Sequence, residues 1–184
     1  MKRLALLLCL LPVMAGARDW AIGPDTRVSA DASWNGSTVV VEFPTIQGRV
    51  VFDEKDIAAT QATIQVATRD ATTGVGLVDR ILRGPDYLGT EKYPSITFHL
   101  DKLVQTSKST ADLIGRVTLR DVTRPATFKA VVIRYGPDPR DASVFDAGFD
   151  ITGQIDRAEF GSTGGLPEVG AVLPVHIRLL MSSR

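Results

Sequence analysis

Apolar and polar residues alternate with a period of two along most of the chain between Val28 and Met181. This alternation is typical of strands that bury one face, and turn-forming residues interrupt it about every ten residues, which favours an antiparallel all-β domain. The Asn35-Gly36 pair favours a two-residue hairpin turn, because both central residues of a type I′ turn need positive φ. We expect about eight or nine strands, depending on whether the first two are separate, at Val28–Trp34, Thr38–Phe43, Gly48–Phe52, Ala62–Thr68, Ser95–Val104, Ala111–Arg120, Ala126–Tyr135, Phe145–Ile155 and Val172–Met181.

The alternation also assigns each side chain to one of two faces. In the fifth predicted strand Phe98 and Leu100 share the apolar face, and His99 points the other way. In the last strand Ile177 and His176 are opposed in the same manner. The apolar face must be buried, either by closure into a barrel or against a second sheet. A closed barrel of about eight strands has an interior that side chains fill or that holds one small ligand, and composition does not choose between these.

The period of two stops between Thr68 and Ser95. Apolar residues recur there at helical spacings, namely at Leu77, Val78, Ile81, Leu82 and Leu88. Gly84-Pro85 interrupts this pattern, so we expect a short helix, a break and a second short turn of helix around Asp86–Gly89. This helical insert is expected to cap one open end of the sheet.

The first 17 residues have the layout of a secretory signal peptide, with a basic start, an apolar run and small residues that end at Ala17. We expect cleavage after Ala17, with an uncleaved anchor as the alternative. The remaining domain, residues 18–184, would then be exported to the periplasm. Cys9 is the only cysteine in the chain and would be removed, which excludes disulfides and thiolate metal sites from the domain.

Charge and histidine content argue against several functions. The chain has 21 basic and 21 acidic residues, so nothing in its overall charge attracts it to nucleic acid. Its two histidines, His99 and His176, are predicted on the outer face, and neither has a second histidine or a cysteine at ligand spacing. We therefore expect no catalytic residues, no metal site and no cofactor.

One polar segment follows a predicted strand, between Ile155 and Gly165, and reads IDRAEFGSTGG. Backbone NH groups of such a Gly-rich loop could receive an anion, with Arg157 supplying the charge. The alternative is a plain strand-end turn in which Arg157 and Glu159 pair with neighbouring groups.

Several motifs in their order along the chain resemble the YceI-like family, which is also called the polyisoprenoid-binding family. The motif LRGPDYLGTEKYPSITF, Leu82–Phe98, resembles that family's leucine, acid-aromatic pair and Tyr-Pro before a strand. The other matching segments are GRVVFD at Gly48–Asp53, GRVTLRDVTRPATF at Gly115–Phe128, IDRAEFG at Ile155–Gly161 and VGAVLPVHIRL at Val169–Leu179.

The resemblance implies an exported, non-enzymatic protein with a lipocalin-like antiparallel barrel and a helical insert. Its apolar cavity would take a long isoprenoid lipid, such as a polyprenyl phosphate or a quinone, as a ligand. Arg83 and Arg157 are the candidate head-group contacts. The candidate cavity residues are Leu82, Tyr87, Phe98, Leu100, Val117, Leu119, Phe128, Phe149, Ile177 and Leu179.

Two other functions stay open from the sequence. The first is an interaction module, in which side chains fill the barrel and its outer face or insert docks a membrane redox protein. The cavity volume distinguishes this module from a carrier, because a filled interior with an exposed apolar patch favours docking. The second is an enzyme that acts on a lipid phosphate through Arg157 and nearby carboxylates at the barrel mouth.

Overall fold

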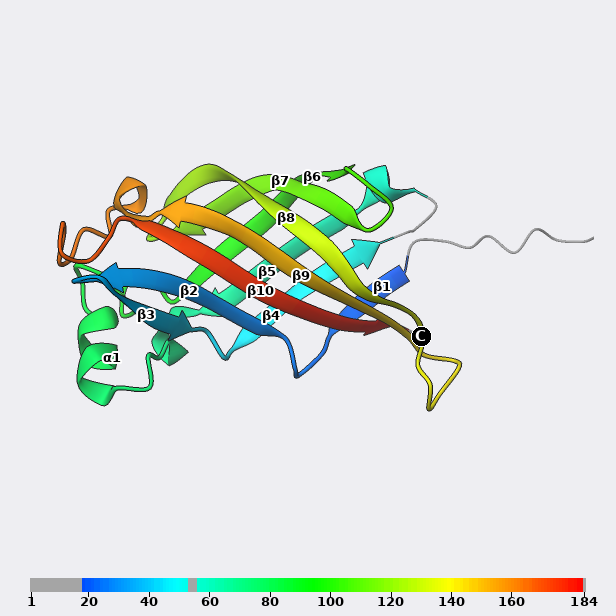
Figure 1. Cartoon of the computed structure of the whole chain (residues 1–184), viewed down its shortest axis with the longest axis horizontal. Coiled ribbons are helices and arrows are strands. Elements are labelled where there is room, and N and C mark those ends of the chain that lie inside the picture. Colours follow the sequence, from blue (N-terminus) through cyan, green and yellow to red (C-terminus); the bar gives the residue numbers. More distant parts are fainter. Residues whose placement is uncertain (1–17, 53–55, 184) are drawn as a thin grey trace, which may run out of the picture.

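A computed structural model of the chain describes residues 18–52 and 56–183, which form one antiparallel sheet of ten strands (Figure 1). The predicted signal peptide lies outside the described residues. The strands are β1 (Arg18–Ile22), β2 (Arg27–Trp34), β3 (Ser37–Glu42), β4 (Ile46–Phe52), β5 (Gln61–Ala67), β6 (Ser95–Gln105), β7 (Thr110–Leu119), β8 (Val122–Pro137), β9 (Phe145–Asp156) and β10 (Val172–Ser183). The helical segments are α1 (Gly76–Leu82) and the 3₁₀ turns η1 (Ile57–Ala59), η2 (Thr68–Asp70) and η3 (Arg157–Phe160).

The sheet closes into a barrel because β1 pairs with both β4 and β10. β1 and β2 lie one after the other along β10, with Ile22 opposite Met181 and Val28 opposite Ile177. β3 and β4 likewise follow one another along β2 and β1. The ten strands therefore occupy eight positions, which confirms the predicted antiparallel barrel of about eight strands.

All nine predicted strands are present, but β1 was not predicted. Its sequence RDWAI offers only two apolar residues in alternation, Trp20 and Ile22, which is too short a run to signal a strand. Between β2 and β3, Asn35 and Gly36 have φ values of 49° and 80°. These positive values confirm the two-residue turn that the Asn-Gly pair predicted.

The insert between β5 and β6 contains one helix, α1, at the predicted place. The second predicted helical turn, around Asp86–Gly89, is wrong, because this segment is a non-helical turn. The amide of Gly89 donates to the carbonyl of Gly84 at 2.8 Å, and Gly89 has a φ of 60°. A residue in this left-handed conformation cannot continue a right-handed helix, so no helix forms after the Gly84-Pro85 break.

The base of the insert is fixed by Thr68, which is fully buried. Its hydroxyl donates to the carbonyl of Tyr93 at 2.6 Å, and its amide donates to the carbonyl of Pro94 at 3.0 Å. Arg120, in the turn between β7 and β8, also donates to the carbonyls of Pro85 and Tyr87. The insert is therefore held at one end of the barrel, the left end in Figure 1.

The outer surface carries the polar side of each strand. His99 and His176 are both exposed there, as predicted, and the His176 ring lies 3.3 Å from the carboxylate of Asp31. Arg178 forms an exposed ion pair with Asp150 across β9 and β10. Within the described ranges, no helix is long and apolar enough to span a bilayer.

Candidate functional site

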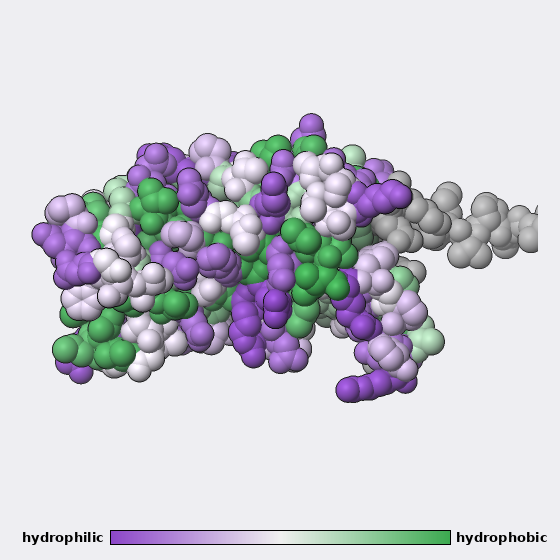
Figure 2. All heavy atoms as spheres, in the orientation of Figure 1, coloured by the Kyte–Doolittle hydropathy of each residue, from purple (hydrophilic) through white to green (hydrophobic). Residues whose placement is uncertain are grey.

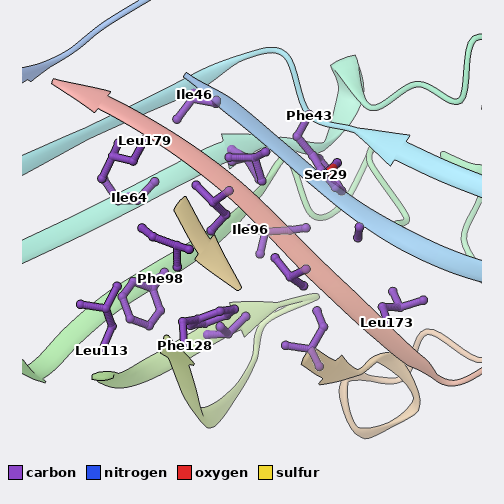
Figure 3. A pocket seen from close by; sticks show the side chains of 18 of the residues that line it. Ser29, Phe43, Ile46, Ile64, Ile96, Phe98, Leu113, Phe128, Leu173 and Leu179 are labelled. Carbon is purple, nitrogen blue, oxygen red and sulfur yellow. The ribbon is translucent and has the colours of Figure 1, made fainter. Parts of the chain in front are cut away.

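The interior of the barrel holds a cavity of about 700 Å³. Side chains from strands all around the barrel point into it, among them Ile46, Ile64, Phe98 and Leu179 (Figure 3). The cavity volume lies within the range of about 300–1,000 Å³ that is typical of small-molecule sites. Because most lining residues are apolar, the cavity can take up an apolar molecule by burial alone, without directional partners.

The ten residues that the sequence predicted for a cavity all line this one, namely Leu82, Tyr87, Phe98, Leu100, Val117, Leu119, Phe128, Phe149, Ile177 and Leu179. Sequence reasoning missed many others, including Val41, Ile64, Val66 and Ile96. The signal for Ile96 was present, because it lies two residues before Phe98 on the same strand and therefore on the same face. Contact with a ligand remains a prediction for all of them.

Phe98 and Phe128 meet inside the cavity with their ring planes at 88° and their centroids 5.4 Å apart. Such an edge-to-face pair is a favoured arrangement of aromatic rings. At the end of the barrel formed by β1, a second group of rings packs together, with Trp20 against Phe52, Tyr135 and Phe145 at centroid distances of 6.2–6.4 Å. These rings close part of that end.

Among the residues that the structure describes, three charged ones line the cavity, namely Lys108, Arg157 and Glu168. Neither histidine is among the lining residues. Within the part of the chain that the structure describes, no group of three or more His, Cys, Asp or Glu side chains is placed to hold a metal ion. The possible chemistry of the cavity is therefore determined by these three residues and a few hydroxyls.

Arg157, a predicted head-group contact, is buried and bound to backbone carbonyls. Its Nε donates to Gly170 at 2.9 Å and its Nη1 to Ser162 at 2.8 Å, while Nη2 donates to Gly164 at 2.9 Å and Val169 at 2.7 Å. Burial lowers the pKa of this guanidinium, although an arginine remains protonated at neutral pH. Four of its five donors are thus already used to hold the loop between η3 and β10.

Of the two arrangements that the sequence allowed for this loop, the structure does not favour the anion site, because several of the loop's own amides are occupied as well. The amide of Ser162 donates to the carbonyl of Arg157 at 3.1 Å, that of Gly164 to Asp86 at 2.8 Å and that of Val169 to Gly165 at 2.7 Å. The strand-end turn, in which Arg157 pairs with neighbouring groups, is the arrangement that the structure shows. Sequence alone reveals the charge of Arg157 but not the carbonyls that it meets.

Arg83, the second predicted head-group contact, does not line the cavity. It lies at the C-terminal end of α1, and its Nη2 donates to the carbonyl of Ala71 at 2.8 Å. The side chain therefore bonds to the base of the insert and is not among the residues that line the cavity.

The insert contributes the wall of the cavity at its own end. Val78, Ile81 and Leu82 of α1 line the cavity together with Tyr87. Ile81 is also 52% exposed, and the neighbouring turn of the helix exposes Leu77 by 67%. Figure 2 shows hydrophobic side chains on the surface where Figure 1 places α1. The insert thus covers this end of the barrel, as the sequence predicted, and presents apolar side chains to solvent beside the cavity.

Asp79 holds the start of α1. Its carboxylate accepts hydrogen bonds from the amide of Thr73 at 2.6 Å and from the hydroxyls of Thr72 and Thr73 at 2.7 Å each. These bonds, the one from the Thr73 amide first, lower the pKa of Asp79 below its ordinary value of 3.8. The carboxylate is thereby more stable in the folded protein than in the unfolded chain.

We expect Asp79→Asn to lower the free energy of unfolding at neutral pH and to have less effect as the pH falls. A lowered folded-state pKa means that the unfolded chain binds more protons, so the stabilisation is present above about pH 4 and is lost as the pH falls further. Urea unfolding at several pH values between 3 and 7 measures this difference, with the exposed Glu91→Gln as control. An equal effect of Asp79→Asn at all these pH values would contradict the account.

A family model described as a YceI-like domain matches residues 20–181, which is nearly the whole barrel. The chain belongs to the YceI-like family. This confirms the family that the sequence motifs resembled. The matched region contains all the residues that line the cavity, from Thr26 to Met181.

Curated relatives of this YceI-like chain include Protein YceI of Shigella flexneri, which is 35% identical over 118 residues. That match covers 64% of this chain and 60% of the relative, so it spans less than two thirds of the relative's length. A UPF0312 protein of Vibrio parahaemolyticus is 31% identical over 173 residues, covering 92% of this chain and 88% of that protein.

Solved structures show the same fold for the YceI-like chain at low sequence identity. BcnA of Burkholderia cenocepacia has a TM-score of 0.75 at 17% identity and covers 89% of this chain and 100% of its own. A polyisoprenoid binding domain from Saccharophagus degradans, described as implicated in plant cell wall breakdown, has a TM-score of 0.66 at 13% identity. It covers 90% of this chain and 98% of its own, so the likeness extends over the complete barrel.

Proposed function

We propose that this protein binds a long-chain isoprenoid lipid, of the polyprenyl phosphate or quinone type, and sequesters or carries it in the barrel. The observation that carries the proposal is the apolar cavity of about 700 Å³. The description of the Saccharophagus degradans neighbour as a polyisoprenoid binding domain supports the same ligand class. The predicted signal peptide agrees with a periplasmic carrier, which would move such a lipid outside the cytoplasm.

The energetics of burial suit a linear lipid tail. Each CH₂ group that leaves water contributes about 0.8 kcal/mol, and it needs no hydrogen-bonding partner in the cavity. Isoprenoid tails are branched and unsaturated, and the lining of Ile, Leu, Val and Phe side chains offers contacts of matching chemistry. Binding rather than catalysis is therefore the function that this interior supports best.

The alternative interaction module, which docks a membrane redox protein, requires a barrel filled by its own side chains. The cavity favours the carrier, because that volume would otherwise be occupied by the protein. The observation that favours docking is the exposure of two apolar residues of α1, Leu77 and Ile81. Ile81 lines the cavity and Leu77 lies one helical turn away, so both are compatible with a carrier that exchanges its lipid with a membrane.

Titration with polyprenols of increasing length tests the proposal. We expect affinity to rise steeply between tails of about 15 and 30 carbons and then to level off once the cavity is full, because each added CH₂ contributes only while it is buried. A linear alkane alcohol of equal carbon number serves as a ligand control for shape. Absence of saturable binding at every length would overturn the proposed function.

A further inference from the structure

Five of the polar residues that line the cavity lie together at the turn between β6 and β7. Gln105, Ser107, Lys108, Ser109 and Thr110 all contribute to the lining there. β6 starts beside the insert, at Ser95, and runs for 11 residues before this turn. Since a strand rises about 3.3 Å per residue, the turn lies roughly 35 Å from the insert as measured along β6. The cavity therefore has polar groups at both ends, those of this turn and, at the insert end, Arg157 and Glu168.

The two ends differ in the charges of their lining residues and in the partners of those charges. The four hydrogen bonds of Arg157 to carbonyls leave it little capacity for a ligand, and Glu168 would repel an anion. Lys108 is exposed, and among the described side chains it has no carboxylate within ion-pair distance. Of the described residues, Lys108 is thus the lining cation that is available to an anionic group.

Hydroxyl groups at the turn form a directed chain of hydrogen bonds. The hydroxyl of Thr110 donates to Ser107 Oγ at 2.7 Å, so the 2.7 Å contact between Thr106 and Thr110 must be donated by Thr106. Ser107 Oγ also accepts from the amide of Ser109 at 3.2 Å. Because Ser107 Oγ accepts two bonds, its own hydrogen is free to donate to a further acceptor. The chain therefore ends in a donor beside Lys108.

We propose that the β6–β7 turn binds the phosphate head of a polyprenyl phosphate, with the Lys108 ammonium and the Ser107 hydroxyl as its partners. This inference rests on the proposed function, and it places the tail along the barrel toward α1. A phosphate offers strong acceptor oxygens and negative charge, and lysine binds it as a point charge. A quinone head is uncharged and gains less from this site, so the turn selects the phosphorylated lipid.

Lys108→Ala tests the head-group site. Wild-type protein and variant are titrated with a polyprenyl monophosphate, with the polyprenol of the same length and with inorganic phosphate alone. We expect the variant to bind the monophosphate about tenfold more weakly, the effect of losing one charge-assisted hydrogen bond, and to bind the polyprenol unchanged. Lys102→Ala is the matched control, because Lys102 is exposed on β6 but does not line the cavity.

The outcomes separate this inference from the proposed function. Equal affinity of wild-type protein and Lys108→Ala for the monophosphate, or equal losses for both lipids, overturns the head-group site and leaves lipid binding in place. Inorganic phosphate that binds as tightly as the lipid would assign the turn to free phosphate and would also overturn it. Failure of the wild-type protein to bind either lipid rejects the proposed function itself.

Discussion

Replacement of Arg157 by alanine is expected to lower the free energy of unfolding by about 4 kcal/mol. The buried guanidinium makes four hydrogen bonds to backbone carbonyls, at 2.7–2.9 Å. A buried acceptor that loses its partner costs about 1–3 kcal/mol, and water entering the space recovers part of this cost. Urea unfolding monitored by circular dichroism measures the change, which corresponds to a fall in Tm on the order of 10 °C.

Two further variants define what the Arg157 result means. Arg157→Lys should recover little of the stability, because a single ammonium cannot donate to the four carbonyls that the planar guanidinium reaches on several sides. Arg178→Ala, in an exposed ion pair with Asp150, should change stability little. If Arg157→Ala unfolded at the same urea concentration as wild-type protein, the structural role assigned to Arg157 would be wrong.

Blocking the cavity should abolish most lipid binding without unfolding the barrel. Ala130 lies on β8, is buried and lines the cavity. Because a cavity of about 150 Å³ accommodates one benzene ring, the ring of Ala130→Phe would occupy about a fifth of the available volume of about 700 Å³. Displacing about three CH₂ groups of a bound tail removes about 2.4 kcal/mol, so affinity for a polyprenol should fall about fiftyfold.

Val131→Phe is the matched control for this variant. Val131 is the next residue on β8, but it is 39% exposed and does not line the cavity. The same ring on the outer face should leave polyprenol affinity unchanged. Equal affinities of the Ala130→Phe and wild-type proteins, with both folded by circular dichroism, would show that the lipid binds elsewhere.

The barrel and its cavity face follow from the alternation of the sequence because each strand buries one side. Alternate residues along a strand share a face, and this rule was sufficient to identify Phe98, Leu100 and Ile177 as lining residues. The alternation does not reveal a strand as short as β1, because its apolar residues Trp20 and Ile22 are too few to form a pattern. Closure of the barrel depends on that strand, so it could be expected only from the need to bury the apolar face.

The polar contacts were less predictable because they depend on partners that are distant in sequence. The charges of Arg83 and Arg157 suggested a head-group site, but the structure directs Arg157 to carbonyls 5 to 13 residues away and Arg83 to the carbonyl of Ala71. Lys108 was not singled out, because a lysine in a Ser-rich turn is common on protein surfaces. Only the closed barrel shows that this turn borders the cavity.

Native mass spectrometry of the protein, purified from cells without detergent, tests the central claim most directly. We expect a population whose added mass equals that of a single isoprenoid lipid, which organic extraction should release and which Ala130→Phe should reduce. The same measurement on Val131→Phe should show the lipid at the wild-type level. A wild-type spectrum with only the mass of the unliganded chain, from cells that contain such lipids, would contradict a lipid-binding barrel.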